Sequence, residues 1–282
     1  MWVVVVTAAA SQGVSDSDAA AVCAALGPDA GPPRRLGPAA VEIPCAGRPA
    51  AGPAVYPAGL DVNVVPAAGQ RKRLLIADMD STMIGCECID ELADLAGVGP
   101  EVSAVTERAM AGELDFDGAL RARVALLRGA DAALIDRVWA ERIRLNPGAE
   151  TLVRTMAAAG AHTMLVSGGF TVFTARVAAA AGFAEHRANR LEVADGRLTG
   201  RVLPPILGRA AKAEAMAEAL AARGLTPADA LAVGDGANDL AMVQAAGLGV
   251  AYRAKPRLAE AADARLDHSD LDALLALQGI GA

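Results

Sequence analysis

The chain has 282 residues and a formal net charge of −7, with 54% hydrophobic but only 3% aromatic residues. This length allows one large domain or two modest ones, with a core built mainly on Ala, Val and Leu. The acidic balance, with a pI of about 5.1, argues against nucleic acid or an anionic membrane surface as the main partner. A bound phosphate must therefore be held by local groups.

The first residues of the chain predict a strand rather than a secretion signal. Val3–Val6 is a run of β-branched residues, and no Lys or Arg precedes Arg34, so the basic leading segment of a signal peptide is missing. No uninterrupted apolar run reaches the roughly 18 residues that a membrane span needs. We therefore expect a cytoplasmic protein with no membrane partner.

The cysteines have no regular spacing, which favours a reduced compartment over a disulfide framework. They are Cys23, Cys45, Cys86 and Cys88. Zinc and redox motifs usually separate their cysteines by two residues and need partners, whereas Cys86 and Cys88 are separated by one. We interpret them as small apolar residues of the interior rather than as a metal or redox pair.

Residues 1–70 are predicted to form a separate N-terminal unit, because nine of the fifteen prolines lie there. Its expected elements are a strand at Val3–Val6, a helix that ends at Gly27, and short apolar pieces near Val41 and at Val62–Val65. The stretch PAAGQRKR that follows is typical of a linker. The pattern indicates a small α/β module.

From Leu74 onward, short apolar strands alternate with helical segments. The predicted strands are Leu74–Ala77, Thr163–Val166, Leu231–Val233 and Leu248–Ala251. The predicted helices include Phe170–Ala181, Ala211–Ala222 and Asn238–Ala246. This alternation predicts an α/β fold over residues 71–282, a Rossmannoid parallel sheet with helices on both faces. Ligands of such sheets bind at the carboxyl ends of the strands.

Between Glu87 and Leu145 no strand pattern appears, so a helical cap is expected at about 87–145, inserted after the first strand of the sheet. Its predicted helices are roughly 87–96, 100–112, 116–128 and 131–143. Further along, the stretch LEVADGRLTGRV alternates around Asp195 and Gly196, which is a strong signal for a two-residue hairpin.

Four short polar stretches each follow a predicted strand in the second unit. They are Asp78-Met-Asp80-Ser-Thr82, Ser167-Gly168-Gly169, Lys212, and Gly234-Asp235-Gly-Ala-Asn238-Asp239. Each alone is a weak signal, since such residues also form capped turns or solvated helix starts. Their order along one parallel sheet makes the set specific for phosphoryl transfer.

The paired carboxylates of Asp78 and Asp80 should repel each other, so that one stays protonated. We predict Asp78 as the nucleophile that forms an aspartyl-phosphate, and Asp80 as the general acid and base. A hard divalent cation, Mg²⁺, is expected between the carboxylates of Asp78 and Asp235 and the backbone carbonyl of Asp80. Here the repulsion favours the one charged and one neutral carboxyl that the first step needs.

The phosphate itself is expected to meet three further groups. Lys212 would supply a positive point charge and Ser167 a hydroxyl donor. The amide of Gly168 can approach closely because no side chain blocks it. These residues are therefore predicted to bind the phosphate group of the substrate.

The segment from about residue 72 to residue 280 resembles the phosphoserine phosphatases of the haloacid dehalogenase superfamily. The stretches that carry the resemblance are DMDSTMIGCECIDELA, AMAGELDFDGALRARVALLRG, LVSGGFTVF, KAEAM and VGDGANDLAMVQAAGLGVAY. The resemblance implies that Glu87 holds the substrate ammonium and that Arg123 holds its carboxylate. It also implies that Met110 and Phe116 close over the substrate.

The same resemblance implies that Asn238 contacts the phosphate side and that Asp239 supports the metal site. A serine phosphate has an ammonium, a carboxylate and a phosphate, for which Glu87, Arg123 and Lys212 offer one complement each. The implied activity is hydrolysis of O-phospho-L-serine to L-serine and phosphate, in serine biosynthesis. The N-terminal module would be a degenerate form of a small-ligand-binding, ACT-like module, and a homodimer is one option for assembly.

Several alternatives stay open at this point. A phosphotransferase could pass the phosphoryl group to another alcohol, and a phosphatase could act on another small phosphomonoester. A signalling receiver domain also uses Mg²⁺ and a phospho-accepting Asp, but Asp80, the cap and the order from Lys212 to Asp239 argue against it. A non-catalytic amino-acid sensor built on the N-terminal module is disfavoured by the complete acid–base pair.

Overall fold

The computed structural model describes residues 1–49 and 56–281, and within them the strands form two separate sheets. The first sheet, here called the N-terminal sheet, has the order β2-β3-β1-β4 with antiparallel neighbours throughout. Its elements are β1 (Trp2–Thr7), α1 (Asp16–Leu26), β2 (Arg34–Gly37), β3 (Ala40–Cys45) and β4 (Asp61–Pro66). The strand β2 was not predicted, since it follows a Pro-rich stretch.

Local chemistry explains the limits of α1. Ser15 caps its first turn, accepting from the amide of Asp18 at 3.1 Å, while the Asp18 carboxylate accepts from the amide of Ser15 at 3.0 Å. The helix stops before Gly27, which adopts a φ of +76°. Side chains of β1 alternate, so that Val4 and Val6 pack with α1 while Val3 and Val5 join the core of the second unit.

The second sheet, here called the central sheet, has the order β11-β10-β9-β5-β6-β7-β8. Its strands are β5 (Leu74–Ala77), β6 (His162–Phe170), β7 (Glu185–Ala194), β8 (Arg197–Leu203), β9 (Ala230–Gly234), β10 (Leu248–Tyr252) and β11 (Ala264–Leu266). All neighbours are parallel except β7 and β8. The predicted parallel α/β fold is confirmed.

The position of β5 decides where a ligand can bind. It lies between β9 and β6, and the chain first proceeds to β6 on one side and returns later to β9 on the other. Such a reversal of strand order opens a crevice at the carboxyl ends of the strands. Asp78 and Asp235 directly follow β5 and β9, so both lie at this crevice.

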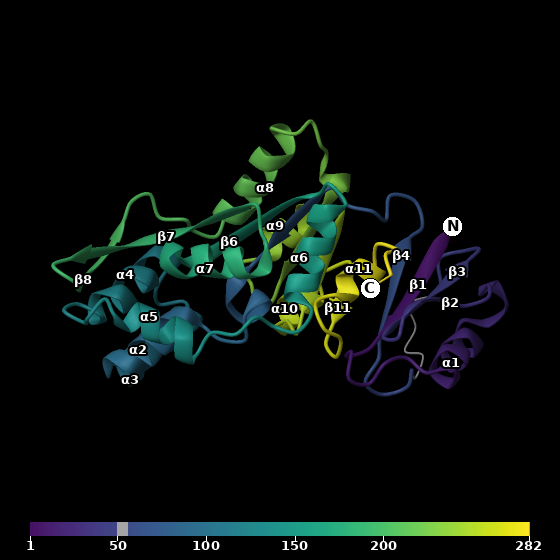
Figure 1. The fold of residues 1–282 in the computed structure, drawn as a ribbon, viewed down its shortest axis with the longest axis horizontal. Coiled ribbons are helices and arrows are strands. Elements are labelled where there is room, and N and C mark those ends of the chain that lie inside the picture. Colours follow the sequence, from purple (N-terminus) through teal and green to yellow (C-terminus); the bar gives the residue numbers. More distant parts are fainter. Residues whose placement is uncertain (50–55, 282) are drawn as a thin grey trace.

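Helices cover both faces of the central sheet (Figure 1). They are α6 (Ala149–Ala158), α7 (Thr171–Ala181), α8 (Ala211–Ala221), α9 (Leu240–Ala245), α10 (Pro256–Ala259) and α11 (Ala273–Ala276). Leu74 and Ile76 of β5 pack with residues of α8 and α9, whereas Leu75 and Ala77 pack with residues of α6, α7 and α11. Burial on both faces explains why this strand is continuously apolar.

The predicted cap is present between β5 and β6 and is helical, as expected. Its helices are α2 (Cys88–Ala96), α3 (Gly99–Met110), α4 (Phe116–Leu126) and α5 (Leu134–Glu141). The two chain segments that enter and leave it pair at Ile84 and Leu145, and Asn146 donates to the carbonyl of Met83 at 2.9 Å. Both connections therefore leave the central sheet beside the loop that follows β5.

The hairpin of β7 and β8 extends the central sheet onto the cap. Asp195 and Gly196 form its predicted two-residue turn with positive φ angles of 49° and 71°. The amide of Gly129 donates to the carbonyl of Leu198 at 2.8 Å, and the amide of Ala132 donates to the carbonyl of Gly196 at 2.9 Å. The sequence predicted the hairpin but not its hydrogen bonds to the cap.

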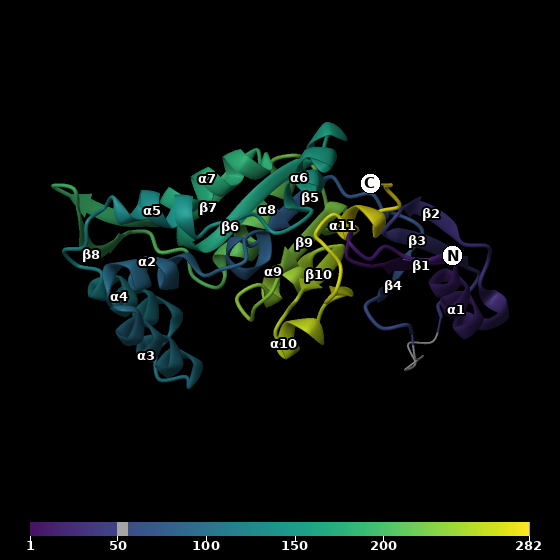
Figure 2. The ribbon, with the colours of Figure 1, turned by 60° about the horizontal axis from the view of Figure 1, so that its bottom comes forward.

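The N-terminal sheet and the cap lie at opposite ends of an elongated molecule (Figure 2). Side chains of β4 join the two sheets: the Asp61 carboxylate accepts from the amides of Asp267, His268 and Ser269, at 2.8 Å from the last. The Asn63 side chain accepts from the amide of Arg265 at 2.8 Å and donates to its carbonyl at 2.9 Å. The division at residue 70 into independent domains stays a prediction.

Two expectations about compartment can be compared with the structure. In the described part of the chain, none of the helices combines the length and the apolar character that crossing a bilayer requires. All four cysteines are described and are free thiols. Cys45 and Cys88 are buried, whereas Cys23 and Cys86 are only partly buried, so the interpretation as interior residues holds for two of the four.

Candidate active site

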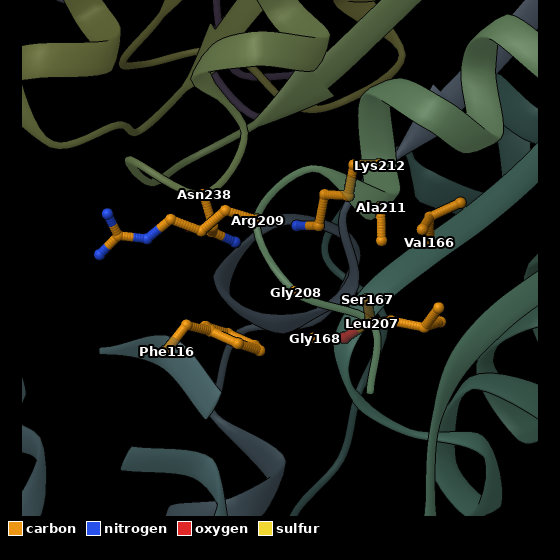
Figure 3. Close-up of a pocket in the computed structure, with 10 residues that line it drawn as sticks. All are labelled: Phe116, Val166, Ser167, Gly168, Leu207, Gly208, Arg209, Ala211, Lys212 and Asn238. Atoms are coloured by element: carbon orange, nitrogen blue, oxygen red, sulfur yellow. The ribbon is translucent and has the colours of Figure 1, made fainter. Parts of the chain in front are cut away.

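The residues predicted to carry chemistry meet at the carboxyl edge of the central sheet. Asp78 and Asp235 follow β5 and β9, Ser167 and Gly168 lie in an irregular part of β6, and Lys212 is the second residue of α8. Ser167, Gly168 and Lys212 line a cavity at this edge, with the cap residue Phe116 opposite them (Figure 3). The cavity is lined by Phe116, Val166, Ser167, Gly168, Leu207, Gly208, Arg209, Ala211, Lys212 and Asn238.

Lys212 lies between two buried carboxylates. Its Nζ is 2.7 Å from Oδ1 of Asp78 and 2.5 Å from Oδ1 of Asp239. Asp78 also accepts from its neighbouring amide, that of Met79, at 2.7 Å, and Asn238 donates to its Oδ2 at 3.3 Å. The predicted nucleophile Asp78 thus contacts both Lys212 and Asn238.

Asp239 organises this cluster and has little capacity left for another ligand. Its Oδ1 contacts Lys212, and its Oδ2 accepts from the amides of Asp235 and Gly236 at 3.2 and 3.0 Å. The Asp239 side chain fits so closely that a Cβ on Gly234 would lie 2.3 Å from its Cγ. Asp239 also belongs, with Asp78 and Asp235, to a group of carboxylates that could hold a metal ion, so its predicted supporting role stays a prediction.

The carboxylates of Asp78, Asp235 and Asp239 have oxygens within 4.8 Å of one another. Burial, and then the charge of Asp239, raise the pKa of Asp78 well above its usual value, while Lys212 opposes this shift. Burial, Asp239 and Glu87 raise the pKa of Asp235 to about 6. Crowded, buried, oxygen-only groups of this kind fit a hard divalent cation, which would relieve their repulsion.

Asp80 occupies a different environment from Asp78. Its Oδ1 accepts from the amide of Cys88 at 2.9 Å, and its Oδ2 accepts from the hydroxyl of Ser167 at 3.2 Å. Burial, and then the nearby charge of Glu87, raise the pKa of Asp80 to about 6. A Cβ on Gly169 would lie 2.9 Å from Oδ2, so a larger residue there would displace the Asp80 carboxylate. Asp80 can therefore hold a proton near neutral pH, as a general acid must.

The predicted substrate-binding residues of the cap differ in how close they lie to the other residues of the site. Phe116 rests against Gly168, where an added Cβ would meet its ring at 3.0 Å. Glu87 accepts from the hydroxyl of Ser81 at 2.7 Å and lies close enough to Asp80 to raise its pKa. Phe116 thus lies beside the predicted phosphate-binding segment, whereas Glu87 is exposed and lies beside Asp80. The substrate contacts of both residues stay predictions.

Arg123 and Met110 are outside the group of residues that line the cavity in the described structure. The Nε of Arg123 is buried and has no hydrogen-bond partner among residues 1–49 and 56–281. Such a donor is available for an anion. Met110 is 78% exposed at the end of α3, so this arrangement does not place it over the cavity, and its role stays a prediction.

Two residues of the site escaped the sequence analysis. Arg209 lines the cavity three positions before Lys212, and in Figure 3 its guanidinium extends past Asn238, away from Lys212. Asn189 on β7 is 1% exposed and hydrogen-bonds two of the cavity-lining segments. Its only signal in the sequence is a polar residue at a position that the strand buries.

Comparisons with known proteins agree with this geometry. The family model of haloacid dehalogenase-like hydrolases matches residues 75–244. The chain is similar to the phosphoserine phosphatase of Streptomyces coelicolor, with 49% identity over 79% of this chain. It spans only 54% of that relative's length.

Solved structures extend the comparison to the fold. A haloacid dehalogenase family hydrolase of Salmonella enterica serovar Typhi matches 98% of this chain and 98% of its own, with a TM-score of 0.84 and 28% identity. A structure described as a phospho-aspartyl intermediate analogue of phosphoserine phosphatase matches 73% of this chain and 98% of its own, with a TM-score of 0.67 and 39% identity.

Proposed function

Because the chain belongs to the haloacid dehalogenase-like hydrolase family, we propose that it is a Mg²⁺-dependent phosphatase that converts O-phospho-L-serine to L-serine and phosphate. The observation that carries the proposal is the contact of Asp78 with Lys212, at a strand end next to Asp235 and below the cap. The names of similar proteins, which are phosphoserine phosphatases, support the choice of substrate.

In the first step, a carboxylate oxygen of Asp78 forms a bond to phosphorus, and the ester bond between phosphorus and the serine oxygen breaks. Asp80 gives its proton to the departing oxygen, which leaves as an alcohol. The raised pKa of Asp80, about 6, suits this donation near neutral pH. Lys212 neutralises charge beside Asp78 while the negative phosphate approaches.

In the second step, Asp80 is a carboxylate and takes a proton from water as the water oxygen bonds to phosphorus. The bond between phosphorus and Asp78 then breaks, which regenerates the nucleophile and releases phosphate. The hydroxyl of Ser167, 3.2 Å from Asp80, helps to stabilise the carboxylate form. Asp80 thus gives one proton to the departing serine oxygen, takes another from water, and ends the cycle protonated again.

Asp78 and Asp235 are the side chains that would hold Mg²⁺, with the backbone carbonyl of Asp80 as a further proposed oxygen. When bound, the cation would neutralise phosphate charge and polarise the phosphoryl oxygens. Asp239 would hold the amide backbone of Asp235 in place through the bonds described above. Lys212, which contacts the other oxygen of Asp239, would disfavour Asp239 as a ligand of the cation.

The proposed recognition of the serine part of the substrate depends on residues of the cap. Glu87 would pair with the ammonium of the substrate, and the unpartnered Nε of Arg123 supports a role in binding its carboxylate. Phe116 would cover the phosphate side beside Gly168. We also propose a cytoplasmic location, which the free cysteines favour, whereas assembly as a homodimer stays a prediction.

The decisive experiment measures phosphate release from O-phospho-L-serine with Mg²⁺ and again with excess chelator. We expect turnover only with the metal, and Asp78→Asn serves as the matched inactive control. Adding an acceptor alcohol separates hydrolysis from transfer, because a transferase would release less phosphate and form a new ester. If other small phosphomonoesters are cleaved far better than phosphoserine, the proposed substrate is wrong while the phosphatase mechanism stands.

A further inference from the structure

The pairing of β6 with β7 is interrupted at the active site. Val166 pairs with Arg187 and Phe170 pairs with Asn189, so β6 advances four residues while β7 advances two. The additional residues of β6 are within Ser167–Gly169, the segment that carries the predicted phosphate-binding groups. A bulge of this kind leaves backbone groups without their usual partners in the sheet.

The side chain of Asn189 supplies a partner for one of these groups and also bonds to a second segment. Its Nδ2 donates to the carbonyl of Gly168 at 2.9 Å and lies 3.4 Å from the carbonyl of Leu207. Its Oδ1 accepts from the amide of Leu207 at 2.7 Å. The side chain is buried, with 1% of the residue exposed, so water does not compete for these groups.

We propose that Asn189 is a positioning residue for phosphate binding, which fixes the segments Ser167–Gly169 and Leu207–Lys212 relative to each other. The proposal rests on the proposed phosphatase function and adds a residue to its site. Asn189 itself does not line the cavity in the described structure, whereas both segments that it joins do. It therefore acts through them.

On the side of β6, the hydrogen bond from Asn189 orients the peptide group between Gly168 and Gly169. The carbonyl of Gly168 points to Asn189, and in a trans peptide the amide of Gly169 then points the opposite way. That amide donates to the hydroxyl oxygen of Ser167 at 2.8 Å. The Ser167 oxygen is thereby fixed as an acceptor, which leaves its proton free to donate to Asp80 at 3.2 Å.

On the other side, Asn189 holds both the amide and the carbonyl of Leu207, as a neighbouring strand would. Gly208, Arg209, Ala211 and Lys212 follow and line the cavity. Lys212 is the second residue of α8 and must place its ammonium between Asp78 and Asp239. Because Leu207 is held in place, fewer residues before Lys212 can move freely. The Lys212 ammonium is therefore restricted to fewer positions.

The test compares Asn189→Ala and Asn189→Asp with Asn63→Ala. Asp retains the shape and the acceptor for Leu207 but removes the donor to Gly168, so it covers the case in which the smaller variant does not fold. Asn63 is a matched control, because its side chain also pairs with a backbone amide and carbonyl, those of Arg265, far from the cavity.

Calorimetric titration with inorganic phosphate in the presence of Mg²⁺ gives affinity and active fraction separately. We expect both Asn189 variants to bind phosphate about 10- to 100-fold more weakly, with a similar loss in kcat/KM and full stoichiometry. Asn63→Ala should stay within about twofold of the unmodified chain in both quantities.

A lower melting temperature with unchanged phosphate affinity in the Asn189 variants would overturn the proposal, since Asn189 would then only stabilise the fold. Phosphate affinity that falls equally in Asn63→Ala would overturn it as well. Because phosphate carries no serine, the outcome does not depend on the substrate. A chain that binds phosphate but does not cleave phosphoserine refutes the proposed substrate and still tests Asn189.

Discussion

Lys212 and Asp78 form an ion pair inside the protein: Nζ and Oδ1 are 2.7 Å apart, and each side chain is 5% exposed. Asp239 lies on the other side of the same ammonium, at 2.5 Å. Two carboxylates that share one cation give the cluster a net negative charge in the absence of metal.

Lys212→Met should abolish turnover and destabilise the fold at pH 8. Removing one partner of a buried pair leaves uncompensated charge, which typically costs about 3–5 kcal/mol. The loss should be smaller at pH 5, because the raised pKa of Asp78 lets its carboxyl take up a proton as the pH falls. Chemical denaturation at both pH values checks this, and an equal loss at pH 5 and pH 8 would show that packing, not charge, is responsible.

Asp80→Asn should separate the two steps of the reaction. The variant cannot protonate a serine oxygen, but p-nitrophenolate leaves without a proton, so the first step should survive with p-nitrophenyl phosphate. The second step lacks its base, and the phosphorylated enzyme should accumulate. Mass spectrometry of rapidly quenched protein should find the phosphate on Asp78; its presence on Ser81 or Thr82 instead would contradict the mechanism.

The affinity for Mg²⁺ should fall as the pH is lowered through about 6. Burial raises the pKa of Asp235 to about 6, and only its deprotonated form can bind the cation. Without metal, the free energy of unfolding changes in the opposite direction with pH. The folded state binds the Asp235 proton more tightly than the unfolded state does, so stability is lost as the pH rises from about 4 to about 6.

Melting curves with and without Mg²⁺ at pH 5 and pH 7.5 measure both effects. The metal should raise the melting temperature more at pH 7.5 than at pH 5. Asp235→Asn is the control and should show little response to Mg²⁺ at either pH. A metal response that is independent of pH would exclude Asp235 as a ligand.

Arg123→Ala should lose most of its kcat/KM on phosphoserine and far less on p-nitrophenyl phosphate, which has no carboxylate. Truncating one partner of a desolvated charge pair costs roughly 2–5 kcal/mol, or about 30- to several-thousand-fold. Arg123→Lys should not restore kcat/KM on phosphoserine, because a bidentate pair with a carboxylate needs the guanidinium. Arg121→Ala, an exposed arginine of the same helix, is the matched control.

Glu87→Gln should follow the same pattern through the substrate ammonium. The informative quantity is the ratio of kcat/KM for the two substrates in each variant. An equal fall in kcat/KM for both substrates would mean that Glu87 and Arg123 stabilise the cap and do not bind the serine part of the substrate.

A fragment of residues 72–282 should retain turnover but melt at a lower temperature than the full chain. The phosphoserine phosphatase structure that matches 73% of this chain is covered almost completely by the match, which supports a fold without an N-terminal module. In this chain, however, Val3, Val5 and Val65 share one core with Leu275 and Leu277 near α11. An inactive but folded fragment would show that the N-terminal sheet shapes the site as well as covering this surface.

Local patterns in the sequence determined the elements and most of the chemistry. The apolar runs before Asp78 and Asp235 predicted neighbouring buried strands, and parallel strands bring their carboxyl ends to one edge. The Asp195-Gly196 turn fixed a hairpin because both positions need positive φ. These inferences hold because periodicity and turn chemistry depend on residues a few positions apart.

Tertiary structure alone decided the contacts between distant segments. Asn189 meets Gly168 and Leu207, which are 21 and 18 residues away in the chain, and Asp61 meets Ser269 across 208 residues. An asparagine or aspartate in a strand has the same local signal whether it is solvated or bridges two segments. Which occurs depends on the backbone groups that packing leaves without partners, and those exist only once the sheets, the bulge in β6 and the cap have been assembled.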